Sequence, residues 1–476
     1  MIIRFPKSSV VAFCFALLAS QVASAAVEYI VTDLGTLSGG KRSWAVALNN
    51  AGQVLGMDDV PGGGTFLYSE GALIDLDSLG TYHRGSRASA LNASGQVTGT
   101  TLTNGPASAF LFAGGTMIVL GGLDPSQTYK YSEGYALNNA GQVVGGASNA
   151  SGDFHAFLYS NGVMADLGVL PGDTQSAALG INTAGQIFGY SGIPNGDTHG
   201  FVYANSQLTT LGTLGGSFCF PVAINQAGQI AGRSSLSTGD THAFRYFGGQ
   251  MVDLGTLGGT YSEALAINDA GQIAGNASTV DGHTHGFLYS NGRMIDIGVL
   301  KTGRGFNYTN VVAMNSAGQI VGDSSVGLLP SGDLHTHPFI YSRGRMTDLL
   351  TVLDSNWNIY VVGINDVGQI AATGSAKGIA AHALLLTPVR LAPRLSAVGG
   401  VSRTTDNAQL VIRGRVSGHA SSVTYRIGAQ KRSLKATGTH AWHFMARLHP
   451  GTNVFTVQAH GARGDSKPLR IAVMRQ

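Results

Sequence analysis

Short hydrophobic segments alternate with polar turns along most of this chain, and one pattern returns at a nearly constant interval. The pattern is small-x-small-[Leu/Ile/Met]-Asn-x-x-Gly-Gln-[Val/Ile], and its glycines fall at 52, 95, 141, 185, 228, 271, 318 and 368. Successive glycines are 43 to 50 residues apart. An interval of this size without helical periodicity predicts four short β-strands in each of eight repeats.

The fifth repeat illustrates the four predicted strands. The first ends at Ile224, and Asn225-x-x-Gly228 turns the chain into the second. The third is His242-Ala-Phe-Arg-Tyr246, and a Gly-Gly turn leads to the fourth at Met251–Gly255. Asn and Gly suit such turns because they accept positive φ. The composition agrees, since 69 glycines combined with 43% hydrophobic residues indicate many tight turns around a buried core.

The two ends of the repeat array predict that it closes on itself. The eighth repeat stops after its third strand, His382–Leu386, whereas an unmatched strand, Tyr29–Gly35, precedes the first repeat. Pairing these two strands completes eight units and removes an exposed sheet edge. We therefore predict an all-β, eight-bladed β-propeller at residues 26–387. The alternatives are an open solenoid, which needs polar caps at both ends, and a ring with another blade count.

The repeats resemble the HAF family of extracellular repeats, named for the His-Ala-Phe triplet found here at 155–157 and 242–244. The resemblance covers roughly residues 30–386 and departs from the pattern at Gly64-Thr-Phe66, Ser108-Ala-Phe110 and Leu384. It implies export and repetition, and it implies no established enzymatic activity.

Residues outside the repeats predict an export signal and a second domain. Arg4 and Lys7, an apolar run and Ala23-Ser-Ala25 form a signal peptide over 1–25. The protein is then secreted or periplasmic, without a membrane span, and Cys219 loses its only potential partner, Cys14. Residues 388–476 lack the repeat and predict a small immunoglobulin-like β-sandwich, because short alternating strands recur and 448–453 resembles a turn of bacterial immunoglobulin-like modules.

Charge is distributed unevenly between the two predicted domains. The net charge is +3, but the chain from Val389 onward has 14 Lys and Arg against two acids, Asp406 and Asp465. The predicted mature chain before Val389 has 13 Lys and Arg against 24 Asp and Glu. A basic domain of this kind predicts an anionic surface as partner, and mutual charge complementation is the alternative. Nucleic acid is not an expected partner.

Histidines recur at one register of the third strand, at His155, His199, His242, His285, His337 and His382. We interpret them as scaffold, bonded to a neighbouring Asp or backbone group much as in WD40 propellers; Asp153, Asp197 and Asp240 lie two residues before three of them. Two repeats carry doubled histidines, His283/His285 and His335/His337, which are weak metal candidates because residues i and i+2 of a strand share a side. We predict no cofactor and no metal.

One position of the first strand varies from repeat to repeat, while its neighbours are mostly small. It lies four residues before the hydrophobic residue and is defined here as the mouth position: Trp44, Arg87, Glu133, Ala177, Phe220, Glu263, Asn310 and Tyr360. The first strand of a propeller blade lines the central channel, so these residues are predicted to encircle one mouth. Aromatic, acidic and amide groups suit a polysaccharide or an extracellular protein, so the first hypothesis is a noncatalytic binding or adhesion protein. The alternative for these positions is a loosely constrained surface.

Two other functions stay open at this point. An exported carbohydrate-active enzyme would use Glu133 and Glu263 as acid and base, although no linear catalytic motif occurs. The third hypothesis is a purely structural surface component without a specific ligand.

Overall fold

The computed structural model describes residues 27–61, 63–79, 85–102, 106–124, 131–194, 196–300, 307–329, 331, 333–353, 357–390, 394–397, 402–405, 409–417, 422–428, 434–436, 441–461 and 464–475. The predicted signal peptide, 1–25, lies outside the described residues. The chain divides into two compact units, and the boundary along the chain lies between Val389 and Arg390. The boundary predicted from the sequence lies between residues 387 and 388. Each unit is described separately below.

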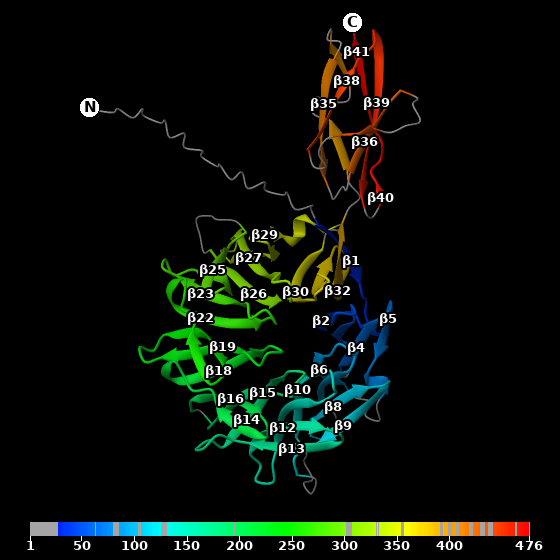
Figure 1. The fold of residues 1–476 in the computed structure, drawn as a ribbon. Coiled ribbons are helices and arrows are strands. Elements are labelled where there is room, and N and C mark those ends of the chain that lie inside the picture. The colour runs from blue at the N-terminus through cyan, green and yellow to red at the C-terminus, as the bar shows by residue number, and fades with distance from the viewer. Residues whose placement is uncertain are drawn as a thin grey trace, which may run out of the picture. The chain divides into compact units, whose positions relative to one another are not determined.

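Residues 28–389 form an all-β, propeller-like unit in which each of the first seven repeats builds four neighbouring antiparallel strands and the eighth repeat builds three (Figure 1). The strands, repeat by repeat, are β2 (Ser43–Leu48), β3 (Val54–Asp58), β4 (Gly64–Ser69), β5 (Ala72–Asp75); β6 (Ser86–Leu91), β7 (Val97–Thr101), β8 (Ser108–Ala113), β9 (Thr116–Gly121); β10 (Ser132–Leu137), β11 (Val143–Ser148), β12 (Phe154–Ser160), β13 (Val163–Gly168); β14 (Gln175–Ile181), β15 (Ile187–Gly192), β16 (Thr198–Ala204), β17 (Gln207–Thr210); β18 (Gly215–Ile224), β19 (Ile230–Leu236), β20 (Thr241–Phe247), β21 (Gln250–Asp253); β22 (Gly258–Ile267), β23 (Ile273–Thr279), β24 (Thr284–Ser290), β25 (Arg293–Gly298); β26 (Thr309–Met314), β27 (Ile320–Leu328), β28 (Leu334–Ser342), β29 (Arg345–Asp348); β30 (Asn358–Ile364), β31 (Ile370–Ala376) and β32 (Ile379–Arg390). Short 3-10 turns follow β5 (Asp77–Leu79) and β29 (Leu349–Thr351). A single parallel bridge between Thr241 and Tyr261 joins the fifth and sixth sheets.

The eighth sheet takes its outer strand from the beginning of the chain. Its order is β1-β32-β31-β30, where β1 is Val27–Asp33. The Leu34 amide donates to the Ala383 carbonyl at 3.0 Å, and Asp33 contacts His382 at 2.9 Å. The predicted pairing of the leading strand with the incomplete last repeat is therefore confirmed.

Seven hydrophobic cores in the described part of the propeller-like unit each lie between two neighbouring sheets and contain the buried Phe of a third strand. Phe244 is fully buried and pairs across the sheet with Gly232, where an added Cβ would lie 2.9 Å from the ring. The same Gly–Phe pairing occurs in the first seven repeats, and in the eighth the smaller Leu384 pairs with Ala372. An added Cβ at Gly232 would lie still closer to the Phe220 carbonyl oxygen, at 2.3 Å, so the glycine accommodates the first-strand backbone as well as the ring. Leu384, which departs from the HAF pattern, is fully buried.

A cycle of buried asparagines ties the sheets together at the turns between first and second strands. Each Asn Nδ2 donates to the backbone carbonyl of the corresponding Asn in the next repeat: Asn49 to Asn92, then Asn138, Asn182, Asn225, Asn268, Asn315 and Asn365. Asn365 then donates back to the Asn49 carbonyl at 3.0 Å. The Asn that recurs in the turn of every repeat therefore also links each repeat to the next.

The second unit has two sheets that share one core. The strands are β33 (Arg394–Ala397), β35 (Gln409–Ser417) and β38 (Ala441–Arg447) in one sheet, and β34 (Ser402–Thr405), β36 (Ser422–Ile427), β37 (Leu434–Lys435), β39 (Gly451–Gly461), β40 (Gly464–Asp465) and β41 (Leu469–Arg475) in the other. Trp442 and Phe444 of the first sheet pack with Phe455 and Val457 of the second. The alternating segments that predict strands in this part of the sequence, 409–413, 422–426, 442–446, 453–457 and 469–473, each lie within an observed strand.

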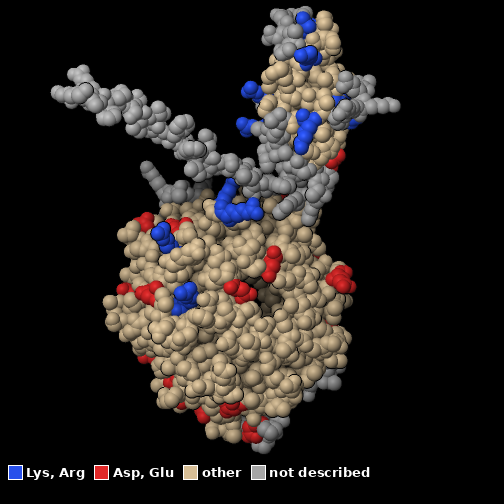
Figure 2. Space-filling view, in the orientation of Figure 1, with Lys and Arg blue, Asp and Glu red and all other residues tan. Residues whose placement is uncertain are grey.

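No helix in the described ranges is long and apolar enough to cross a membrane. Figure 2 shows a hollow at the centre of one face of the propeller-like unit, with acidic side chains beside it. The described surface of the second unit carries mostly basic charges in the same view (Figure 2).

Candidate functional site

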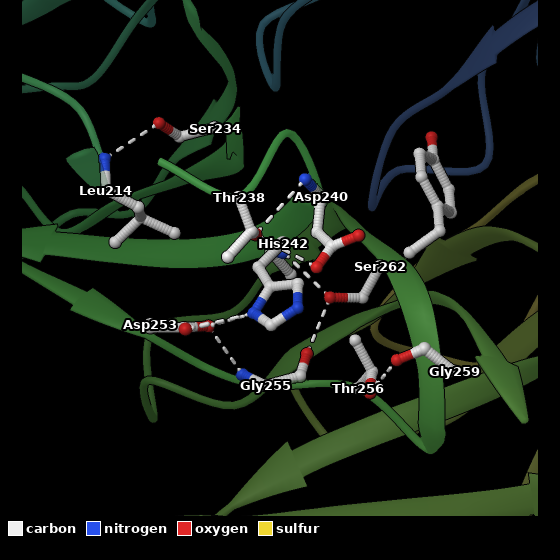
Figure 3. A network of polar contacts seen from close by, with 12 residues as sticks. Leu214, Ser234, Thr238, Asp240, His242, Asp253, Gly255, Thr256, Gly259 and Ser262 are labelled. Carbon is white, nitrogen blue, oxygen red and sulfur yellow. Dashed lines mark hydrogen bonds and ion pairs between the residues drawn. The ribbon is translucent and has the colours of Figure 1, made fainter. Parts of the chain in front are cut away.

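The repeated histidines belong to a polar network that joins neighbouring sheets (Figure 3). His242 Nδ1 contacts the Asp253 carboxylate at 2.9 Å, and Asp253 accepts from the Gly255 amide at 2.7 Å. Ser262, in the first strand of the next repeat, donates to the Gly255 carbonyl at 2.6 Å and accepts from the Ala243 amide at 2.8 Å. Ser262 thus connects its own repeat to two segments of the preceding repeat, which agrees with a scaffold function.

The carboxylate partner comes from the fourth strand and not from the residue two positions before the histidine. His155, His285 and His337 pair with Asp166, Asp296 and Asp348, and His382 pairs with Asp33 of β1. His199 is the exception and contacts Asp173 at 3.1 Å. Its fourth strand carries Thr210 opposite Phe201, where Asp253 stands opposite Phe244, so no carboxylate is available there.

The doubled histidines are engaged separately. His285 is bound to Asp296 at 2.8 Å, and His283 lies 3.6 Å from Asp281. The His335 and His337 rings contact edge to face, with centroids 4.9 Å apart, so this pair does share a side of its strand. Among the described residues, no group of three His, Cys, Asp or Glu side chains is arranged to hold a metal ion.

Each mouth position lies opposite one residue of the second strand, which therefore shares its face of the sheet. The pairs are Trp44–Met57, Arg87–Thr100, Glu133–Gly146, Ala177–Tyr190, Phe220–Arg233, Glu263–Asn276, Asn310–Asp323 and Tyr360–Thr373. These second-strand residues were missed by the sequence analysis. The signal was present, because the residue after the second-strand Gly varies as freely as the mouth position itself.

Side chains of the fourth to sixth repeats form a continuous chain of contacts. Tyr190 stacks on Phe220 with ring centroids 5.8 Å apart, and the Arg233 guanidinium lies 5.4 Å from the same ring. Arg233 also donates to Glu263 at 2.7 Å, across the boundary between two repeats. Arg233, which the mouth-position pattern does not include, therefore links Phe220 and Glu263.

The contacts continue into the seventh repeat. Asn276 Nδ2 donates to Asn310 Oδ1 at 2.9 Å, and Asn276 Oδ1 accepts from the Val311 amide. Asp323, opposite Asn310, is partly buried, and this burial raises its pKa to about 6. Ala177 is buried and offers no functional group.

Glu133 of the third repeat is held by two tyrosines of its own strand region. The Tyr131 hydroxyl donates to one carboxylate oxygen at 2.6 Å, and the Tyr135 hydroxyl donates to the other. The hydrogen bond to Glu133 raises the pKa of Tyr131 to about 12. Glu133 and Glu263 thus occupy different surroundings, one with phenols and the other with a guanidinium.

Three mouth positions are exposed and lie in consecutive repeats across the chain closure. Tyr360 is 63% exposed and Trp44 is 36% exposed, and Arg87 is exposed as well. The Ala45 amide donates to the Thr373 hydroxyl at 3.1 Å, which joins the first and eighth sheets next to Trp44 in sequence and opposite Tyr360 in the sheet. The mouth positions therefore include an interconnected set in the fifth to seventh repeats and an exposed set in the eighth, first and second repeats.

Comparison with known proteins gives only distant structural similarity. Neither a protein-family model nor a curated protein sequence matches this chain. A puromycin-hydrolyzing peptidase from Mycobacterium tuberculosis is 10% identical, with 76% of this chain and 60% of that chain covered and a TM-score of 0.41. A prolyl endopeptidase is 9% identical (92% and 55% covered, TM-score 0.44), and TolB from Acinetobacter baumannii is 13% identical (57% and 62% covered, TM-score 0.31). The chain spans less than two thirds of each of these structures, and similarity at this level does not bear on activity.

Proposed function

We propose that residues 28–389 are an exported eight-bladed β-propeller whose mouth positions bind a polysaccharide or an extracellular protein without catalysing a reaction. The cycle of asparagine hydrogen bonds and the pairing of β1 with β32 support the closed ring. The HAF resemblance of the repeats supports export.

The observation that carries the binding function is the contrast between two adjacent positions of the first strand. The residue before the mouth position is Ser or Thr in six repeats, whereas the fifth and eighth repeats carry Cys219 and Ile359. Ser262 illustrates the scaffold contacts of this position through its bonds to Gly255 and Ala243. The mouth position itself differs in every repeat except the third and sixth, and two of its aromatic residues are exposed. Exposed aromatic side chains next to polar groups are typical of surfaces that recognise sugars or peptides.

For the second unit we propose an immunoglobulin-like sandwich that contacts an anionic surface. The excess of 14 basic over two acidic residues supports this interaction.

A glycan array and a displayed peptide library, both probed with the full mature chain, test the binding proposal. The Trp44→Ala/Tyr360→Ala double variant is expected to lose at least tenfold in affinity for any ligand that the wild type selects. Phe247→Ala is the matched control, because Phe247 is equally exposed but lies at the end of β20, away from the mouth positions. Unchanged binding in the double variant would contradict the proposal.

A further inference from the structure

Two tyrosine hydroxyls fix the orientation of the Glu133 carboxylate. Its two oxygens accept hydrogen bonds from Tyr131 and Tyr135, which lie two residues to either side. The pKa values of both tyrosines are raised, that of Tyr131 first by this hydrogen bond and that of Tyr135 first by burial. Both phenols therefore stay protonated and act as donors that fix the carboxylate.

The aromatic rings beside Glu133 make the site more than a single acid. The Phe154 ring contacts Tyr131 with centroids 5.9 Å apart at an interplanar angle of 49°. Gly146 lies opposite Glu133, and an ideal Cβ built on it would lie 2.2 Å from Phe154. Phe154 thus occupies the space that a side chain takes in the other repeats. We call Tyr131, Glu133, Tyr135 and Phe154 the Glu133 cluster.

Comparison with Glu263 shows what the cluster lacks. Glu263 holds the same register and forms an ion pair with Arg233 at 2.7 Å. No Lys, Arg or His within the described ranges forms an ion pair with Glu133. A partly buried carboxylate is stabilised by a cation, and aromatic rings beside it attract the same charge through their faces.

We propose that the Glu133 cluster binds the primary ammonium group of a ligand, as found in an amino sugar or a lysine side chain. This inference rests on the proposed binding function of the mouth positions and names the chemistry of one part of them. An ammonium group is a compact donor that can use the remaining lone pairs of Glu133 while it contacts Tyr131 and Phe154.

Isothermal titration of the full mature chain with three soluble probes tests the proposal. The probes are a glucosamine tetramer with free amines, an N-acetylglucosamine tetramer, and a lysine tetrapeptide with blocked ends. At least one of the two amine probes is expected to bind at least tenfold more tightly than the acetylated sugar. Preference for the glucosamine tetramer assigns an amino sugar, and preference for the peptide assigns a protein ligand; both support the ammonium site. Equal binding of all three probes, or no binding of either amine probe, would overturn it.

Variants localise the effect. Glu133→Gln is expected to lower amine binding at least tenfold, and Tyr131→Phe, which keeps the ring and removes the donor, about threefold to fivefold. Glu70→Gln, in the exposed turn between β4 and β5, is the charge-matched control and is expected to bind like the wild type. Near-UV circular dichroism confirms that each variant is folded.

One combination of results would separate this inference from the proposed function. If Glu133→Gln binds the amine probes normally while Trp44→Ala/Tyr360→Ala abolishes ligand binding, the mouth binds but the ammonium site is wrong. Lys130 lies outside the described residues, so Lys130→Ala is measured too. Amine binding at least tenfold tighter in that variant would mean that Lys130 already neutralises Glu133, and would overturn the inference, whereas unchanged binding supports it.

Discussion

The asparagine cycle makes a quantitative prediction about the closure of the repeat array. Asn182 lies inside the array, and Asn365 bridges its last and first repeats. Both side chains are buried and make the same three hydrogen bonds. In Asn182 and Asn365 respectively, Nδ2 donates to the backbone carbonyl of the Asn in the next repeat (3.1 and 3.0 Å) and to the side-chain oxygen of the Gln four residues later (2.8 and 2.9 Å). Oδ1 accepts from the backbone amide of that Gln (3.0 and 2.8 Å). Replacement by Ala removes all three in each case.

At about 1 kcal/mol for each buried hydrogen bond, Asn182→Ala and Asn365→Ala should each lower the free energy of unfolding by about 3 kcal/mol. The two losses in unfolding free energy should be equal in a closed ring. In an open array Asn365 would have no inter-repeat acceptor, so its replacement would cost less. Asn50→Ala is the control. It removes two exposed hydrogen bonds with Asp366 that also join the first and eighth repeats, and should cost less than about 0.5 kcal/mol.

Urea unfolding followed by pulsed hydrogen exchange measures these costs on peptides from residues 28–389 alone, so the second unit does not contribute. A shift of the midpoint with an unchanged denaturant slope gives the free-energy difference. The reasoning is refuted if Asn365→Ala costs at least about 1 kcal/mol less than Asn182→Ala, since that is the worth of the closing hydrogen bond.

Three further predictions follow from buried or bonded groups. Burial raises the pKa of Asp323 to about 6, so the charged form of this side chain destabilises the fold. Asp323→Asn should therefore leave the stability unchanged below pH 4 and raise it progressively through pH 6, by about 1–2 kcal/mol at pH 7 after allowance for solvent screening. A pH-independent effect in thermal unfolding would contradict this. His242→Ala removes the contact with Asp253 and should cost about 1 kcal/mol in urea unfolding, whereas loss of ligand binding by this variant alone would argue against a scaffold function. Burial raises the pKa of the Cys219 thiol to about 12, so iodoacetamide should label it only in denaturant, and rapid labelling of the native protein would show that the first strand of the fifth repeat opens readily.

The repeat spacing and the unmatched strands at the two ends were sufficient to predict the sheets and the β1–β32 pairing. Those features depend on local periodicity and on counting strands, and both are visible in one dimension. The pairing of Leu384 with Ala372 could also have been found, because the residue two places after the second-strand [Val/Ile] changes together with the ring.

The partners of the histidines and of the mouth positions were harder to predict. The His242–Asp253 contact depends on the register of the hairpin between β20 and β21, so the acid nearest in sequence, Asp240, was a misleading candidate. The Arg233–Glu263 contact crosses between repeats, and a pattern taken from the first strand alone does not contain Arg233. Sequence periodicity gives the position of a side chain within its own sheet, whereas its neighbour in the next sheet depends on packing.

The contact between Asp33 and His382 joins groups 349 positions apart in the chain. Folding rates fall as the mean sequence separation of native contacts increases, since the entropy of closing a long loop is lost before the contact forms. Of the strands β1 to β32, the first to be synthesised is thus the one whose partner is completed last. Until β32 has been synthesised, β1 presents an unpaired backbone edge, and we expect the nascent protein to be most prone to aggregate in the interval just before the final repeat is assembled.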